Sequence, residues 1–141
     1  MTAEQNKEVA SRAFEALMAR DLNRLEPLLA PGAVLHQCGF PEPIPVRSIT
    51  RGEFPRWRLL DDRQVQLERI VGEADLVALH WRTTGKYNDP ATPELNGKPV
   101  SFPSMTFIRF EGSKIAEIWN IQDTTTMQMQ LQSPAEPPER R

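Results

Sequence analysis

Hydrophobic residues recur at helical spacing near the start of the chain. Over residues 3–20 they occupy every third or fourth position and leave charged residues on the opposite side, which predicts an amphipathic first helix. Asp21 can cap a second, shorter helix that carries leucines as far as Leu29. Pro27 should distort or divide this second helix, because proline has no amide hydrogen.

A short strand over residues 33–38 and a proline-rich loop are expected next. Thr50 and Glu53 then have the spacing of a capping box in front of Trp57, although Pro55 can instead open this third helix at its first turn. With either start, the pattern predicts three helices before the sheet.

Alternating hydrophobic and polar residues replace the helical pattern after Asp62. Residues 63–71 and 76–87 predict one antiparallel hairpin, and residues 100–110 and 114–123 predict another after a loop rich in Asn, Asp and Pro. The order of elements indicates an α+β fold, in which three N-terminal helices precede an antiparallel sheet.

On one face of the last predicted strand, a mostly apolar row of side chains ends in a carboxylate. Alternation places on one face Ile115, Glu117, Trp119, Ile121 and Asp123. With Gly112 and Ser113 as the central turn residues, Phe102 would face Asp123 across the hairpin, and Ser104 would face Ile121.

Asp123 is therefore a candidate general acid/base. The pKa of a carboxyl group beside buried aromatic rings tends to rise because the charged form loses hydration, and such a group can accept a proton and return it. The structural alternative is that Asp123 ends the strand and caps the turn at residues 124–126.

The other face of this hairpin is also apolar, since it carries Met105, Phe107, Ala116 and Ile118. A strand that is apolar on both faces is usually covered on both, and three small helices cover one side of a curved sheet. A homodimer formed through the sheet is expected to cover the second side.

Composition narrows the classes of function. The 141 residues suggest one domain over residues 1–132, followed by a disordered tail over residues 133–141. A net charge of −2 leaves no basic surface for nucleic acid or an anionic membrane. The single Cys38 excludes an internal disulfide, and no signal peptide or apolar run of membrane length is evident, which favours a cytoplasmic protein.

Several other residues invite a functional interpretation. His36 and Cys38 share a strand face, but two ligands without a second His or Cys pair make a poor metal site, so no metal is expected. By alternation, either His80 or Trp81 faces the interior. For Glu117, a bulge or an ion pair with an arginine is a simpler expectation than a second carboxylate in one apolar pocket.

Four blocks of residues together resemble a known family. They are Leu28-Leu29-Ala30-Pro31-Gly32-Ala33-Val34-Leu35-His36; Glu73-Ala74-Asp75-Leu76-Val77-Ala78; Gly97-Lys98-Pro99-Val100-Ser101-Phe102 with Phe107-Ile108-Arg109-Phe110; and Lys114-Ile115-Ala116-Glu117-Ile118-Trp119 with Asp123. Their order and spacing resemble those of the SnoaL-like polyketide cyclases, within the nuclear-transport-factor-2-like superfamily. The resemblance implies a cone-shaped fold with a curved antiparallel sheet.

The resemblance also implies an activity. In that family, the aspartate after the Glu-x-Trp strand is understood as the acid/base for an intramolecular aldol closure of a polyketide ring, without metal or cofactor. By resemblance that residue is Asp123, with His36 in a supporting polar role. The residues expected to bind the substrate are Gln37, Trp57, His80, Phe102, Ser104 and Trp119.

The sequence thus predicts a cofactor-independent cyclase or isomerase in which Asp123 acts on a small hydrophobic carbonyl compound. Two alternatives stay open. An epoxide hydrolase on the same scaffold would need an Asp/Arg/Asp cluster, with Arg82 or Arg109 pointing into the pocket. A non-catalytic ligand-binding or accessory protein would leave Asp123 solvated or locked in a salt bridge.

Overall fold

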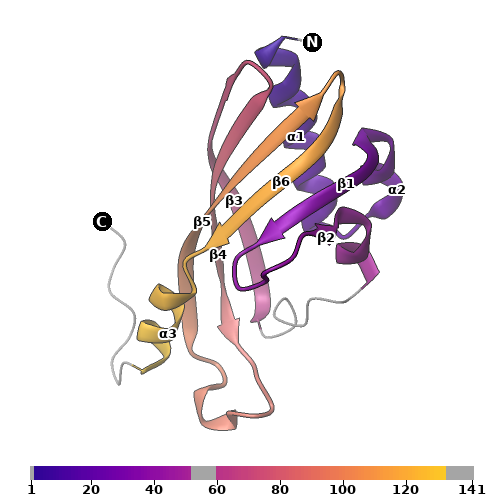
Figure 1. The fold of residues 1–141 in the computed structure, drawn as a ribbon. Helices are drawn as coiled ribbons and strands as arrows, with labels where there is room; N and C mark the ends of the chain where they lie inside the picture. Colours follow the sequence, from indigo (N-terminus) through magenta and orange to yellow (C-terminus); the bar gives the residue numbers. More distant parts are fainter. Residues whose placement is uncertain (1, 52–59, 133–141) are drawn as a thin grey trace.

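Six strands form one curved, mixed sheet in the order β2-β1-β6-β5-β4-β3 (Figure 1). The computed structural model describes residues 2–51 and 60–132. The strands are β1 (Leu29–Gln37), β2 (Ile44–Pro45), β3 (Leu60–Glu73), β4 (Leu76–Tyr87), β5 (Pro99–Glu111) and β6 (Lys114–Gln122). The α-helices are α1 (Ala3–Met18), α2 (Leu22–Leu25) and α3 (Thr124–Gln132). The expected α+β class is confirmed.

One pairing in the sheet departs from the expected antiparallel arrangement. β1 runs parallel to β6, whereas all other neighbouring strands are antiparallel. β1 also begins at Leu29 rather than at residue 33, and its register against β6 is irregular as far as Val34. Hydrophobic alternation cannot reveal this pairing, because it assigns residues to faces and does not identify the neighbouring strand.

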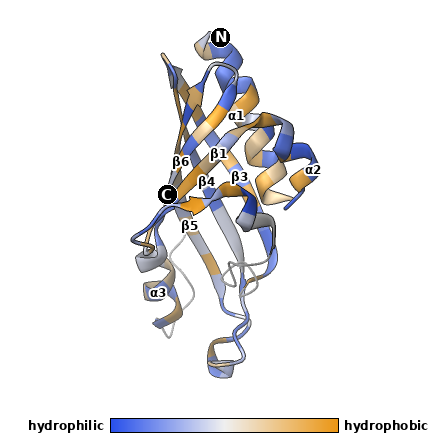
Figure 2. Cartoon of the chain, turned by 45° about the vertical axis from the view of Figure 1, so that its right-hand side comes forward, coloured by the Kyte–Doolittle hydropathy of each residue, from blue (hydrophilic) through white to orange (hydrophobic). Residues whose placement is uncertain are grey.

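The first helix follows its amphipathic pattern, with both hydrophobic and hydrophilic stretches along its length (Figure 2). Thr2 and Gln5 form a capping box, in which Thr2 Oγ1 accepts from Gln5 N at 3.1 Å and Gln5 Oε1 accepts from Thr2 N at 2.9 Å. α1 ends at Met18 rather than at residue 20. The buried alanines Ala10, Ala13 and Ala16 present little bulk and allow the helix to lie close to its neighbours.

The second helical segment is short and divided, as Pro27 predicts. Asp21 caps α2 by accepting a hydrogen bond from Arg24 N at 3.2 Å. A 3-10 turn, η1 (Glu26–Leu28), then includes Pro27 and leads into β1. Two further 3-10 turns are η2 (Val46–Arg51) and η4 (Pro93–Leu95). The expected third helix around Trp57 and the expected tail at 133–141 fall outside the described residues.

A bulge in the β5–β6 hairpin changes which residues share a face. Gly112, whose φ of 58° suits a residue without a Cβ, follows β5 at the expected turn, and Phe110 pairs with Ile115 as expected. The register then shifts, so that Arg109 pairs with Glu117 and Ile108 with Ile118. Ile115 is thereby separated from the remaining members of the predicted row.

The pairings expected farther along this hairpin are therefore wrong. Ser104 pairs with Gln122 rather than with Ile121, and the backbone N–H of Asp123 donates to Pro103 O at 3.0 Å rather than lying opposite Phe102. Met105 and Phe107 consequently share a face with Trp119, not with Ile118.

The two faces of the sheet differ in burial. We call the side against which α1 packs the inner face, and the opposite side the outer face. The main core on the inner face includes Leu35, Val77, Leu79, Trp81, Ile108 and Ile118. A second buried cluster consists of Tyr87, Val100, Phe102 and Leu131. The outer face leaves large apolar side chains exposed, namely Val71, Leu76, Met105, Phe107 and Ile121.

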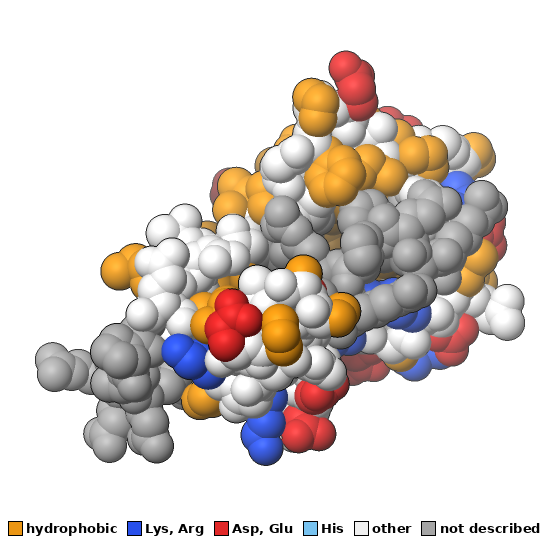
Figure 3. Space-filling model, turned by 90° about the horizontal axis from the view of Figure 1, so that it is seen from below, with side chains coloured by type: hydrophobic (Ala, Val, Ile, Leu, Met, Phe, Trp, Pro, Cys, Tyr) orange, Lys and Arg blue, Asp and Glu red, His pale blue; other side chains and the backbone are white. Residues whose placement is uncertain are grey.

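The C-terminal helix α3 was not expected from the sequence. It lies against β5, where Leu131 joins the second buried cluster and the Gln130 amide bonds the backbone of Ser101 in both directions, at 2.9 and 2.8 Å. Seen from below, this end of the molecule exposes hydrophobic and charged side chains next to one another (Figure 3). Within residues 2–51 and 60–132, no helix combines the length and apolar character needed to cross a membrane.

Candidate functional site

A row of polar side chains crosses the inner face of the sheet. It consists of Gln37 on β1, Asn120 on β6, Thr106 and Ser104 on β5, and Thr83 on β4, and we call it the polar belt. On β4 and β5 the belt lies between the main core and the second buried cluster. The three hydroxyl residues are buried, whereas the two amides are half-buried. Apolar walls with a few convergent polar groups are typical of small-molecule sites.

Four side chains at the belt form a continuous chain of hydrogen bonds. The indole Nε1 of Trp81 donates to Thr106 Oγ1 at 2.9 Å, and this hydroxyl donates to Asn120 Oδ1 at 2.8 Å. Asn120 Nδ2 in turn donates to Gln37 Oε1 at 3.1 Å. Phe14 of α1 meets Trp81 edge-on, with ring centroids 5.3 Å apart, and so holds the indole in place.

Two belt hydroxyls are buried without a partner. Thr83 Oγ1 and Ser104 Oγ make no hydrogen bond, although their residues are only 3% and 2% exposed. A buried polar atom without a partner is unfavourable by about 1–3 kcal/mol, so it calls for a specific explanation. A ligand atom that bonds these hydroxyls would provide one.

Asp123 lies where β6 ends and acts as the cap of α3. Its Oδ1 accepts from the backbone N–H of Thr126 at 2.9 Å, and its Oδ2 accepts from the Thr126 hydroxyl at 2.7 Å. These hydrogen bonds hold the pKa of Asp123 below its ordinary value, because they stabilise the charged form. The expected rise of this pKa is therefore wrong, and the geometry matches the capping alternative.

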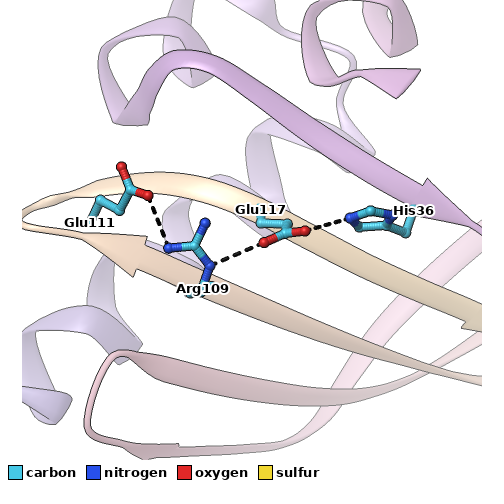
Figure 4. A network of polar contacts seen from close by, with 4 residues as sticks. All are labelled: His36, Arg109, Glu111 and Glu117. Carbon is cyan, nitrogen blue, oxygen red and sulfur yellow. Dashed lines mark hydrogen bonds and ion pairs between the residues drawn. The ribbon is translucent and has the colours of Figure 1, made fainter. Parts of the chain in front are cut away.

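His36 belongs to a network of polar contacts on the outer face (Figure 4). His36 Nε2 lies 2.6 Å from Glu117 Oε2, and Arg109 Nε lies 3.1 Å from Glu117 Oε1. Arg109 also pairs with Glu111 at 3.1 Å. The hydrogen bonds from His36 and Arg109 lower the pKa of Glu117. Both simpler expectations for Glu117, a nearby bulge and an ion pair with arginine, are confirmed.

The other predicted site residues divide between the two faces. Gln37 and Ser104 belong to the polar belt, and Phe102 lies beside it in the second buried cluster. Trp119 stacks on His36 with ring centroids 5.2 Å apart, away from the belt. His80 pairs with the exposed Met105, so the indole of Trp81 rather than the imidazole of His80 faces the interior. Trp57 lies outside the described residues.

His36 and Asp123 do not contact each other. His36 pairs with Trp119, which lies four residues before Asp123 along β6. At about 3.3 Å per residue, this places the two backbones roughly 13 Å apart along the strand. The structure thus does not bring together the two residues predicted to share the chemistry.

Sequence reasoning misses Asn120, Thr106 and Thr83. Strict alternation along residues 114–123 assigns Asn120 to the face opposite the presumed site. The bulge at the register shift instead places Asn120 on the inner face, with Ile118. Thr83 and Thr106 interrupt otherwise apolar alternating rows on β4 and β5, which is a weak signal that could have marked them.

No metal site emerges from the described part of the chain. There, no group of three or more His, Cys, Asp or Glu side chains could hold a metal ion. An open depression of about 360 Å³ lies near the β3–β4 turn. Its lining is mostly apolar and comprises Val71, Gly72, Glu73, Ala74, Leu76, Ala78 and Phe107. It includes no residue of the polar belt.

Comparison with solved structures supports the same fold. IdmH from Streptomyces antibioticus, a proposed polyketide cyclase, superposes with a TM-score of 0.77 at 24% identity, covering 92% of this chain and 99% of that one. A proposed SnoaL-like polyketide cyclase from Jannaschia sp. CCS1 gives 0.77 at 18% identity, covering 94% and 95%. AclR from Streptomyces galilaeus, a proposed hydroxylase, gives 0.70 at 19% identity, covering 92% and 97%.

At these identities the structural likeness establishes the fold alone. A search of curated proteins found no match. The family model of SnoaL-like polyketide cyclases, however, matches residues 7–131, which is most of the chain. The chain therefore belongs to the SnoaL-like polyketide cyclase family.

Proposed function

We propose that this protein binds a small hydrophobic, polyketide-like carbonyl compound against the polar belt and promotes its intramolecular aldol closure or double-bond migration without a cofactor. The apolar residues on either side of the belt would hold the body of the ligand, and the belt would hold its carbonyl oxygen. The observation that carries the proposal is the pair of buried hydroxyls, Thr83 and Ser104, that lack partners.

In this proposal Asp123 removes the proton α to the carbonyl. Its lowered pKa keeps the carboxylate ionised at neutral pH, so it is ready to accept a proton, although it is a weaker base than a carboxylate with a raised pKa. The half-buried amide N–H groups of Asn120 and Gln37 would stabilise the enolate oxygen that develops. His36 is left out of this step because it pairs with Glu117 on the outer face.

A second candidate is a binding protein without turnover. It is favoured by the contacts of Asp123, whose two carboxylate oxygens are both engaged by Thr126. The inner face of the described strands supplies amides and hydroxyls, and the polar belt contains no carboxylate. Such a protein would hold the same class of ligand and release it unchanged.

An epoxide hydrolase would need Arg82 or Arg109 to point into the pocket, and the contacts of both arginines lie elsewhere. Arg82 pairs with Glu68 at 3.2 Å and donates to Ser101 Oγ at 3.0 Å, while Arg109 pairs with Glu117 and Glu111. Arg82 on β4 and Arg109 on β5 alternate with buried inner-face residues, so neither guanidinium points toward the belt.

Replacement of Asp123 by asparagine separates the two candidates. Asparagine caps helices about as well as aspartate, so Asp123→Asn should stay folded while losing the base. With a panel of polycyclic aromatic ketones that offer an enolisable position, we expect ring closure or isomerisation to fall at least ~10²-fold and binding to remain. Full turnover by Asp123→Asn would contradict the catalytic role, and binding without turnover by the natural chain would establish the second candidate.

A further inference from the structure

We infer that the buried hydrogen bonds of Trp81 and Thr106 hold the amides of Asn120 and Gln37 in one orientation, so that the belt offers N–H donors and selects ligands with an acceptor oxygen. This inference rests on the proposed ligand site and adds that the site presents hydrogen-bond donors rather than acceptors. It concerns binding, and it holds whether or not the ligand is turned over.

The direction follows from the chemistry of the four side chains. An indole N–H can donate a hydrogen bond but cannot accept one, so Thr106 must accept from Trp81. The single hydroxyl hydrogen of Thr106 donates to Asn120 Oδ1 at 2.8 Å, and because Thr106 is buried, a flipped Asn120 would leave that hydrogen without its acceptor.

The orientation of Asn120 also fixes that of Gln37. Because the oxygen of Asn120 faces Thr106, its NH₂ group faces Gln37, and the atom of Gln37 that it meets must be the oxygen. The NH₂ group of Gln37 is thereby turned away from Asn120, where its one contact is the weak acceptor Cys38 Sγ at 3.4 Å.

The series of hydrogen bonds that starts at Trp81 consequently ends in N–H donors. Each NH₂ group has two hydrogens, and the contacts of Asn120 and Gln37 use one each. Both residues are half-buried, and in this inference the ligand meets these remaining hydrogens. A ketone or enolate oxygen complements them, whereas a hydrocarbon of the same shape leaves them without a partner.

The buried indole also makes this polarity hard to reverse. Trp81 is 1% exposed and is held by Phe14, so its N–H has no solvent alternative to Thr106. Flipping either amide would place two donors or two acceptors against each other, at the cost of a buried unsatisfied group. Trp81 and Thr106 are therefore positioning residues, and Asn120 and Gln37 are the ligand-contacting residues.

The test compares two naphthalene probes of similar shape, 2-acetylnaphthalene with a ¹³C-labelled carbonyl and 2-ethylnaphthalene. For the natural chain we expect the ketone to bind about tenfold more tightly than the hydrocarbon, as two modest hydrogen bonds would give. Isotope-edited infrared spectroscopy should show the carbonyl stretch of the bound ketone at lower frequency than in hexane, because donors lengthen the C=O bond.

Three variants make the outcome specific. Asn120→Leu combined with Gln37→Leu removes both donors and should abolish the tenfold preference and the infrared shift. Thr106→Val keeps the amides and removes the link to Trp81, so the preference should fall while the ketone still binds. Gln128→Leu, a replacement of the same kind at an exposed position of α3, should change neither readout. Circular dichroism of each variant confirms that it is folded.

The outcomes separate this inference from the proposed function. Equal affinity of the natural chain for both probes, or an infrared shift that survives in the variant with both Asn120→Leu and Gln37→Leu, would overturn the inference alone. If neither probe binds, the inference and the proposed ligand site both fail. Since no readout depends on turnover, an inactive but ketone-selective protein would support the inference and argue against catalysis.

Discussion

Asp123 accepts two hydrogen bonds from Thr126, one from its backbone N–H at 2.9 Å and one from its hydroxyl at 2.7 Å. The residue singled out as a general acid/base is thus also the cap of α3, the helix that carries Leu131 onto the second buried cluster. A capping carboxylate stabilises a helix start in its charged form. The same contacts therefore bear on stability and on any proton transfer by Asp123.

Replacing Thr126 by valine should raise the pKa of Asp123 toward the ordinary value of about 3.9. The stabilisation from a lowered carboxyl pKa is present above the pKa of the unfolded chain and is lost as the pH falls through the folded pKa. The variant should therefore lose at most about 1 kcal/mol at pH 7, and less as the pH falls through the lowered pKa of Asp123.

Carboxyl NMR titration and urea denaturation measure these two effects of Thr126→Val. Thr125→Val is a matched control, because Thr125 is exposed on the same helical turn. An unchanged Asp123 titration in Thr126→Val would contradict the capping geometry.

Glu117→Gln should reduce stability in a pH-dependent way. Hydrogen bonds from His36 and Arg109 lower the pKa of Glu117, so their contribution is present at pH 7 and is lost as the pH falls through that lowered value, below the ordinary ~4.3. These groups are partly exposed, so we expect a loss of no more than about 1 kcal/mol at pH 7.

Urea denaturation of the natural chain and of Glu117→Gln between pH 2 and pH 7 checks this expectation. Glu111→Gln is the control, since Glu111 contacts Arg109 alone in this network and is more exposed. A stability difference that stays constant over the whole pH range would show that the ion pair is not its source.

The homodimer expected through the sheet stays a prediction. On the outer face, Met105, Phe107 and Ile121 are 61%, 53% and 66% exposed, which is unusual for large apolar side chains next to one another. Ile121→Lys should therefore shift the mass measured by light scattering from two chains toward one, because a lysine pair would be buried at the interface.

Met129→Lys offers a matched control for Ile121→Lys. Met129 is 67% exposed but lies on α3 rather than on the outer face, so this replacement should leave the mass unchanged. A natural chain with the mass of one chain at all concentrations would refute the dimer.

Gly85→Ala should destabilise the β3–β4 hairpin beside the second buried cluster. A Cβ at Gly85 would lie 3.0 Å from Asp61 O and 3.2 Å from Leu60 Cβ, and a backbone oxygen cannot easily move away. We expect a loss of about 1–3 kcal/mol in urea denaturation. Gly72→Ala should also be destabilising, because a Cβ there would lie 2.9 Å from Lys7 Cγ and 3.3 Å from the backbone oxygen of Ala3.

Local patterns in the sequence were enough to predict the elements. Helical spacing predicts α1, Asp21 caps α2, and Gly112 lies in the turn between the last two strands, as the structure confirms. These features depend on residues within a few positions of one another, which is why they can be recognised in a single chain. The sequence motifs were also enough to indicate the family, which the family model confirms.

The faces of the last hairpin were decided by the tertiary structure. The shift between Phe110–Ile115 and Arg109–Glu117 exchanges the faces of Ile118 and Trp119 relative to strict alternation. It places Glu117 between His36 on β1 and Arg109 on β5, and it turns Asn120 inward to the polar belt. Whether a strand bulges depends on its neighbours, so alternation along one strand could not predict it.

The sequence by itself therefore determined the α+β class, most of the strands and the family, because each of these depends on local spacing and on the order of motifs. The tertiary structure alone decided the parallel β1–β6 pair and the contact of Trp81 with Thr106, 25 residues away in the chain. Such contacts join residues that are distant in sequence, and their geometry exists only once the sheet has formed.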